Sequence, residues 1–282
     1  MKIANVAGRV ALLRDNGYID VQRASNARFG ADITDIYDRW DEFTEWAATQ
    51  ADAPVQALDE SQIGAPSPRP RQVFAIGLNY RDHAAEANLD IPTDSMVVFT
   101  KFPSSITGPY DQIEHPGGSV DFETELVVVM GRRAFHVAAD DAWSCVAGVT
   151  LGQDVTEREL QWRPPSPQFN LGKSYPGFAP IGPALVTVDE FADRDDIEIG
   201  CLINGEQMQK GRTGNMIFPV GQVIEYLSAV LPLYPGDLIF TGTPAGIGFV
   251  RDPKRLLNVG DELVTQAAGI GEMRNRFISP TA

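Results

Sequence analysis

Cysteine and histidine are scarce in this sequence. Only two cysteines are present, Cys145 and Cys201, and both lie in apolar segments where cysteine usually acts as a small core hydrophobe. Two cysteines provide neither a disulfide framework nor a thiolate zinc site. Only three histidines occur, and none belongs to an H-E-x-x-H zinc motif. These absences disfavour the common thiolate and histidine zinc sites.

Positive charge and long apolar runs are also limited. The chain has 23 lysines and arginines against 38 aspartates and glutamates, a net charge of −15, which opposes binding to nucleic acid. No run reaches the roughly 18 apolar residues of a membrane helix. The opening stretch MKIANVAGRV lacks the charged and apolar regions of a signal peptide. We therefore expect a cytoplasmic protein with no nucleic-acid or membrane partner.

Two common catalytic motifs are missing. The serines of FPSSITG do not form the G-x-S-x-G turn of a serine hydrolase. The stretch TGTPAGIGF is rich in glycine, yet it lacks the G-K-[ST] ending of a phosphate-binding loop and does not complete G-x-G-x-x-G. A serine hydrolase is therefore disfavoured, and a nucleotide is not required.

The composition is otherwise that of an ordinary globular protein. Hydrophobic residues make up 43% and charged residues 22% of the 282 residues, enough for a substantial core. The segment GAPSPRPRQ, residues 64–72, carries three prolines within five residues, and proline both removes a backbone donor and disfavours helix before it. We place a boundary here, between a small N-terminal α/β domain of residues 1–66 and a main domain of residues 67–282.

The spacing of apolar residues predicts a β-rich main domain with few helices. In the N-terminal part, DNG at residues 15–17 is typical of a hairpin turn. A helix is expected from Ile33, because apolar side chains recur there at three- and four-residue steps, at Ile36, Tyr37, Trp40, Phe43 and Trp46. Strands are expected at Val73–Ile76, Met96–Thr100, Leu126–Met130, Cys145–Leu151, Ala184–Val188, Ile197–Ile203, Leu238–Phe240 and Glu262–Gln266. Helices are expected at Val220–Val230 and near Asp82–Ala87.

Three carboxylates stand directly before one of the most apolar stretches, in VDFETELVVVM. In a strand, Asp121, Glu123 and Glu125 would point one way and their neighbours the other. Like charges beside a buried strand repel and resist desolvation, and a hard divalent cation such as Mg²⁺ removes that conflict. A solvated face on an edge strand is the alternative. The balance shifts toward a metal because Asp154, a candidate third ligand, ends a second buried strand.

The histidines and one lysine supply further candidates. His83 has Glu86 three residues later, which would orient the imidazole as a general base if both lie on one helical turn. An exposed pair without function is the alternative. We expect His115 and His136 in loops or at the surface. Lys173 is flanked by glycine, serine, tyrosine and proline rather than by charges, and it could neutralise a bound anion.

The order of these segments resembles the fumarylacetoacetate hydrolase family. GLNYRDHAAE, DFETEL, GQDVTERELQ, GKSYPGFAPIGP, PGDLIFTGTPAGIG and GIGEMRNRF follow one another between about residues 71 and 278. The resemblance implies an α+β fold with a catalytic domain of mixed β-roll or β-sandwich type, commonly assembled as a homodimer. Gln153, Glu157 and the YPGF segment after Lys173 depart from the usual family pattern, which leaves the substrate open.

The resemblance also implies roles for individual residues. Mg²⁺ or Mn²⁺ would be held by Glu123, Glu125 and Asp154. His83 and Glu86 would form a catalytic pair on a short lid helix, together with the family's lysine at Lys173. Substrate contacts would fall on Arg158, Gln161 and Thr243.

The implied reaction is hydrolysis of a carbon–carbon bond in a 2,4-diketo acid of the acylpyruvate or fumarylpyruvate type, giving pyruvate and a carboxylic acid. The hypothesis is that the substrate chelates the metal, that His83 deprotonates a water, and that Lys173 stabilises developing negative charge. Oxaloacetate decarboxylation, or a hydratase or isomerase reaction on the same scaffold, is the nearest alternative. A catalytically silent binding or scaffold protein is the alternative of another class.

Overall fold

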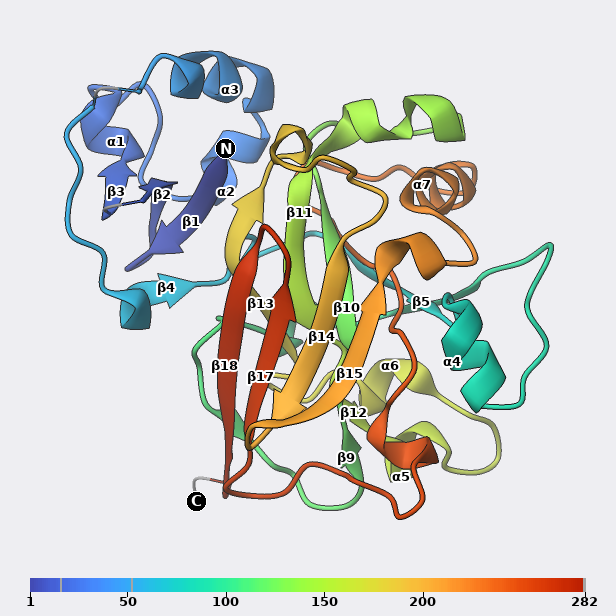
Figure 1. Ribbon diagram of the computed structural model, residues 1–282. Helices are drawn as coiled ribbons and strands as arrows, with labels where there is room; N and C mark the ends of the chain where they lie inside the picture. Colours follow the sequence, from blue (N-terminus) through green and yellow to red (C-terminus); the bar gives the residue numbers. More distant parts are fainter. Residues whose placement is uncertain (16, 52, 281–282) are drawn as a thin grey trace.

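A long, mixed β-sheet runs through the molecule and carries most of the strands that the sequence predicts (Figure 1). The computed structural model describes residues 1–15, 17–51 and 53–280. The order of the sheet is β3 (Gly17–Asp20), β2 (Arg9–Arg14), β1 (Lys2–Val6), β13 (Ala179–Val186), β11 (Val146–Gln153), β10 (Thr124–Met130), β16 (Leu238–Phe240), β5 (Val73–Gly77) and β6 (Val97–Thr100), with β4 (Ile63–Gly64) beside β1 and β7 (Ile106–Thr107) beside β13.

A second sheet packs against β10, β11 and β13 of the first (Figure 1). Its order is β15 (Glu206–Arg212), β14 (Glu198–Ile203), β17 (Glu262–Ala267), β18 (Gly271–Ile278) and β8 (Ile113–Glu114). A separate pair is formed by β9 (Val120–Asp121) and β12 (Thr156–Glu157). Both larger sheets mix parallel and antiparallel pairs. The predicted α+β class is confirmed.

The helices are few and short. The α-helices are α1 (Val21–Ala24), α2 (Thr34–Tyr37), α3 (Trp40–Ala48), α4 (Arg81–Glu86), α5 (Arg158–Gln161), α6 (Phe169–Gly172) and α7 (Val220–Ser228). The 3-10 turns are η1 (Glu60–Gln62), η2 (Pro103–Ser105), η3 (Ala139–Cys145), η4 (Val188–Glu190), η5 (Thr213–Asn215) and η6 (Gly248–Val250). Within the described ranges, no helix has the length and apolarity needed to cross a membrane.

Strand β10 lies in the middle of the large sheet, between β11 and β16. Its side chains alternate between two cores: Leu126 and Val128 pack in the cluster that includes α7, and Val127 and Val129 pack in the cluster that includes α2 and α3. A strand buried on both faces has a continuous apolar sequence rather than an alternating one. The edge-strand explanation for the acids before this strand was therefore wrong.

The N-terminal residues continue the large sheet. Strand β1 pairs with β13, and the predicted hairpin is formed by β2 and β3. The helical stripe from Ile33 is buried as expected, but it forms two helices, because the backbone leaves the helical conformation at Arg39. The large sheet and one hydrophobic cluster both contain residues from either side of the proposed boundary between residues 66 and 67. A division into two domains at that point stays a prediction.

Candidate active site

The structure brings the three predicted metal ligands together at the start of β10 and the end of β11. These strands are antiparallel, with Thr124 opposite Gln153, so Glu123 and Glu125 meet Asp154 across the pair. One carboxylate oxygen of each residue lies within 4.8 Å of the other two. The exposed fractions of Glu123, Glu125 and Asp154 are 8%, 1% and 0%. We call these three residues the acid triad.

Gln153, one of the departures from the family pattern, fixes the geometry of this crossing. Its Oε1 accepts a 2.9 Å hydrogen bond from the Glu123 amide, and its Nε2 donates to the hydroxyls of Thr124 at 2.9 Å and Thr265 at 3.0 Å. The Asp154 amide in turn donates to the Glu123 carbonyl at 2.9 Å. All polar groups of Gln153 are thereby used inside the core, where an unpaired amide would be costly.

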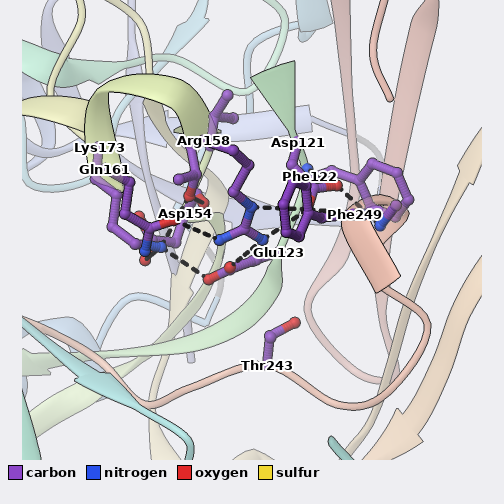
Figure 2. A network of polar contacts seen from close by, with 12 residues as sticks. Asp121, Phe122, Glu123, Asp154, Arg158, Gln161, Lys173, Thr243 and Phe249 are labelled. Carbon is purple, nitrogen blue, oxygen red and sulfur yellow. Dashed lines mark hydrogen bonds and ion pairs between the residues drawn. The ribbon is translucent and has the colours of Figure 1, made fainter. Parts of the chain in front are cut away.

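The third acid of the DFETE stretch has a different place. Asp121 belongs to β9, and the strand is interrupted before β10 begins at Thr124, so one unbroken strand through this stretch was wrong. Asp121 and Glu123 nevertheless face the same guanidinium nitrogen of Arg158. The Asp121 carboxylate accepts from Arg158 at 2.6 Å (Figure 2). It also accepts from the amide of Gly248 at 2.8 Å. Asp121 therefore holds an arginine in place beside the acid triad.

Three buried cations surround the acid triad. Lys173 Nζ lies 2.9 Å from Glu123 and 2.6 Å from Asp154, and Arg158 donates to Glu123 at 2.7 Å (Figure 2). Lys101, which the sequence analysis missed, donates to the other oxygen of Asp154 at 2.6 Å. Burial lowers the pKa of Lys101, whereas the pKa of Lys173 is raised because the attraction of Asp154 and Glu123 outweighs burial.

The charges of the acid triad are unevenly compensated. Burial alone would raise the pKa of Glu123, but the positive charges of Lys173 and Arg158 outweigh it and hold the pKa at about 2. Burial raises the pKa of Glu125 well above its ordinary value, and the charges of Asp154 and Glu123 add to the effect. The contact that Glu125 makes is a 2.7 Å hydrogen bond from the Gly242 amide. Among the described residues, no salt bridge reaches Glu125.

This imbalance fits a hard divalent cation. Three carboxylates can each turn an oxygen to one point, and oxygen ligands of this kind are those that Mg²⁺ and Mn²⁺ prefer. A dication would compensate Glu125, the one acid that the lysines and the arginine leave without a partner.

Replacing Lys101 with methionine should lower the free energy of unfolding by about 3 kcal/mol, because one of the two ammonium groups that hold the buried Asp154 is lost. Urea denaturation in EDTA measures the change. Lys210→Met is the matched control, since Lys210 pairs with Glu198 at the surface over 3.7 Å and its loss should cost under about 1 kcal/mol. Equal effects of the two substitutions would show that the buried pair does not stabilise the site.

The histidine pair lies on α4, as its spacing predicts. His83 Nδ1 lies 2.7 Å from Glu86 Oε1, and the second oxygen of Glu86 accepts a 2.8 Å hydrogen bond from the Gly246 amide. The side chains of His83 and Glu86 are 13% and 21% exposed, which rules out the fully solvated pair considered from the sequence. Both carboxylate oxygens of Glu86 therefore have a partner, and Glu86 can hold the imidazole ring of His83 in one orientation.

The glycine-rich segment TGTPAGIGF connects these parts. Its amides donate to three carboxylates: Gly242 to Glu125, Gly246 to Glu86 and Gly248 to Asp121. Gly242 and Gly246 have φ values of +99° and +103°, and a Cβ at Gly248 would lie 2.0 Å from a backbone oxygen. The glycines thus bring backbone donors to acids rather than to a phosphate.

A cavity of about 370 Å³ opens over Glu123 and Glu125 of the acid triad. Its polar lining comprises His83, Glu123, Glu125, Arg158, Gln161, Lys173 and Thr243, and its apolar lining comprises Ile76, Gly77, Leu78, Ala87, Leu89, Val97, Phe99, Trp162, Phe169, Ile247, Phe249 and Val250. The structure thus places the three predicted substrate-contact residues at the cavity wall. Gln161 accepts from Arg158 at 3.0 Å, and Thr243 accepts from Gln209 at 2.8 Å.

The two remaining histidines lie outside helices and strands, as expected. His115 lies in the loop after β8, as expected, but its side chain is buried, and its Nε2 lies 3.0 Å from the Leu257 carbonyl. His136 is exposed as expected.

Lys173 lies within 2.9 Å of three acceptors, Glu123, Asp154 and Thr156, so its ammonium already has a protein acceptor for each of its protons. Its direct use on substrate charge stays a prediction.

Comparison with known proteins shows which family has this architecture. The pattern of the fumarylacetoacetate (FAA) hydrolase C-terminal domain matches residues 72–278. The mitochondrial oxaloacetate tautomerase FAHD2A of Homo sapiens is 42% identical over 233 residues, which cover 82% of this chain and 74% of that protein. The 2,4-didehydro-3-deoxy-L-rhamnonate hydrolase of Sphingomonas sp. (strain SKA58) is 43% identical over 220 residues, or 77% of this chain and 76% of that protein.

A solved structure extends the likeness to the whole chain. A crystal structure from Mycobacterium smegmatis, provisionally assigned as an HpcE protein, has a TM-score of 0.94 and 54% sequence identity, and the match covers 100% of both chains. The match therefore includes the N-terminal residues as well as the site. This chain belongs to the fumarylacetoacetate hydrolase family.

Proposed function

We propose that the protein is an enzyme that hydrolyses a carbon–carbon bond in a 2,4-diketo acid with the help of Mg²⁺ or Mn²⁺. The observation that carries the proposal is the acid triad at the base of a cavity, with a buried, uncompensated Glu125 and an oriented His83 on the same wall. Named relatives of the chain act as a hydrolase and as a tautomerase of an oxo acid.

The acid triad would hold the metal. When bound, the cation supplies Lewis-acid polarisation of the 2-oxo group and charge compensation for the leaving enolate. Arg158 and Lys173 keep Glu123 ionised, and Lys101 and Lys173 orient both oxygens of Asp154. These cations therefore prepare the ligand set rather than the substrate.

His83 would act as the general base. When Nδ1 carries the proton and donates a hydrogen bond to Glu86, Nε2 can accept a proton from a water molecule. The hydroxide oxygen adds to the 4-carbonyl carbon, the bond between C3 and C4 breaks, and its electron pair stays on C3 as the pyruvate enolate. The enolate takes up a proton at C3, so the products are pyruvate and a carboxylic acid.

Oxaloacetate tautomerisation is a second candidate, because a 42% identical relative carries that activity. The same base would then move a proton between C3 and the enol oxygen, and neither water addition nor bond cleavage would follow. Decarboxylation of oxaloacetate, the alternative considered from the sequence, would release carbon dioxide.

Incubation in ¹⁸O-water distinguishes these reactions. With Mg²⁺ or Mn²⁺ present, we expect an acylpyruvate to give pyruvate and a carboxylic acid that carries one ¹⁸O atom. Mass spectrometry detects the label, and EDTA should stop turnover. The proton added at C3 should come from solvent, so deuterated water should label the pyruvate methyl group. Loss of the enol absorbance of oxaloacetate without cleavage of any acylpyruvate would favour the tautomerase instead.

A homodimer in the cytoplasm stays our proposal for the assembly and the location. Light scattering on the purified chain tests the assembly, and a mass near twice 30.7 kDa is expected. Localisation in the source cells needs a separate fractionation experiment.

A further inference from the structure

The wall of the cavity changes in character from its base to its mouth. At the base lie Glu123 and Glu125 of the acid triad, which are 8% and 1% exposed. At the mouth lie Leu89, Val97, Trp162 and Val250, which line the same cavity and are 55%, 43%, 51% and 39% exposed. Exposed apolar side chains of this size gathered around one opening are unusual on a protein surface unless a ligand or partner covers them.

The cations of the cavity are already in use. Arg158 and Lys173 are the arginine and the lysine in the lining, and both contact carboxylates of the protein at 2.9 Å or less. Lys254 lies 3.7 Å from the centroid of the Phe249 ring, yet it is not part of the lining. Along the described part of the chain, no lining residue therefore offers an unpaired positive charge near the mouth.

The two ends of a substrate would face these two environments. An oxo acid whose carboxylate and 2-oxo group lie at the acid triad must point its other end toward the mouth, because the base is closed by buried residues. A second hollow of about 370 Å³ shares Arg158, Trp162 and Phe249 with the cavity and extends the space available there.

We propose that the substrate carries an uncharged, apolar acyl tail, an alkyl or aryl group that lies between Val97, Leu89, Trp162 and Val250. This inference rests on the proposed function, since that function fixes which end of the substrate meets the acid triad. A tail that ends in a carboxylate, as in fumarylpyruvate, would leave its charge among apolar side chains without a partner. Oxaloacetate carries no acyl tail and would leave the apolar wall uncovered.

A matched substrate pair tests the tail directly. 4-Methylpentanoylpyruvate and succinylpyruvate differ only at the end of the acyl tail. The first ends in an isopropyl group and the second in a carboxylate of similar shape. We expect kcat/KM to be at least 30-fold higher for the isopropyl compound, on the order of the loss caused by an unpaired buried charge. Along a series of straight-chain acylpyruvates, kcat/KM should rise about threefold per methylene until the mouth is filled. A preference for succinylpyruvate, or no dependence on chain length, would overturn the proposal.

Neighbouring residues on β6 provide a matched pair of variants. Val97 lines the cavity, whereas Val98 points to the other face of the strand and is similarly exposed, at 38%. Val97→Lys should lower kcat/KM for 4-methylpentanoylpyruvate about tenfold and raise it for succinylpyruvate, while Val98→Lys should leave both unchanged. Lys254→Met should not change the ratio between the two substrates. Equal effects of Val97→Lys and Val98→Lys would contradict the placement of the tail.

A binding measurement keeps the tail separate from the reaction. If every acylpyruvate is inert, the proposed hydrolysis has failed, but calorimetry with Mg²⁺ still tests the tail with oxo acids that need no turnover. 2-Oxoheptanoate should then bind at least tenfold more tightly than 2-oxoadipate. Tighter binding of 2-oxoadipate would contradict the proposed apolar tail whether or not the chain is a hydrolase.

Discussion

Glu125→Gln should abolish divalent-cation binding and lower kcat by about 1000-fold or more, the largest effect expected of any single substitution. The loss reflects the several kcal/mol of charge stabilisation that a metal contributes to such a reaction. Glutamine has nearly the same shape as glutamate, and its Oε1 can still accept the hydrogen bond from Gly242. The substitution therefore removes the charge of one ligand and little else. Calorimetric titration with Mn²⁺ and steady-state kinetics measure both consequences.

The same variant should be more stable than the parent when no metal is present. Glu125 is buried, and its pKa is raised well above the ordinary value by burial and by Asp154 and Glu123, so its ionised form opposes folding at neutral pH. Glutamine removes that cost. In EDTA we expect a higher Tm for Glu125→Gln than for the parent, whereas Mn²⁺ should raise the Tm of the parent but not that of Glu125→Gln. Glu45→Gln, an exposed site, is the control and should change neither value. Parent-like metal binding in Glu125→Gln would exclude this residue as a ligand.

His83→Gln should lower kcat for hydrolysis by about 100- to 10,000-fold, the range usual for loss of a general base, and leave Mn²⁺ affinity unchanged. The side chain lines the cavity without belonging to the acid triad, so base and metal can be separated. Glu86→Gln should have a smaller effect, because it weakens the orientation of the ring but leaves the base present. Electron paramagnetic resonance of bound Mn²⁺ checks that the metal site is intact.

The exposed His136 provides the matched control for this experiment. His136→Gln should have the kcat of the parent, since this residue does not line the cavity. Full hydrolytic activity in His83→Gln would remove the proposed role of the histidine pair. Full oxaloacetate tautomerisation in the same variant, combined with lost hydrolysis, would mean that the two reactions use different bases.

Parts of the site that depend on local sequence could be predicted. Glu123 and Glu125 stand directly before an apolar run, and Asp154 directly follows another, so their positions at strand ends are fixed by the chain itself. His83 and Glu86 are three residues apart on one short helix. In each case the neighbours along the chain determine the geometry.

Parts of the site that depend on contacts between distant segments of the chain could not be predicted. Lys101 meets Asp154 and the carbonyl of Lys173 only because the chain folds across the sheet, and its own surroundings, FTKFPSS, give no sign of burial. Asp121 is held by Arg158 and by the amides of Gly248 and Phe249, which come from other segments of the chain. Strand β18 was missed because arginine and asparagine interrupt its apolar positions, although Met273 and Phe277 alternate as in a half-buried strand.

The apolar mouth of the cavity likewise could not be read from the sequence. Its residues come from the segment after α4, from β6, from the end of α5 and from η6, which are far apart along the chain. Single apolar residues in such segments are common and carry no signal by themselves. Their shared position around one opening is a property of the fold alone.

The most direct test of the account is a crystal structure of the protein with Mn²⁺, with anomalous diffraction used to locate the ion. The account predicts a single strong anomalous peak with oxygens of Glu123, Glu125 and Asp154 about 2.0–2.2 Å away, and water or an oxo acid at the remaining positions on the cavity side. Saturating Mn²⁺ without such a peak, with Glu123 and Asp154 held only by Lys101, Lys173 and Arg158 and Glu125 held only by the Gly242 amide, would contradict it.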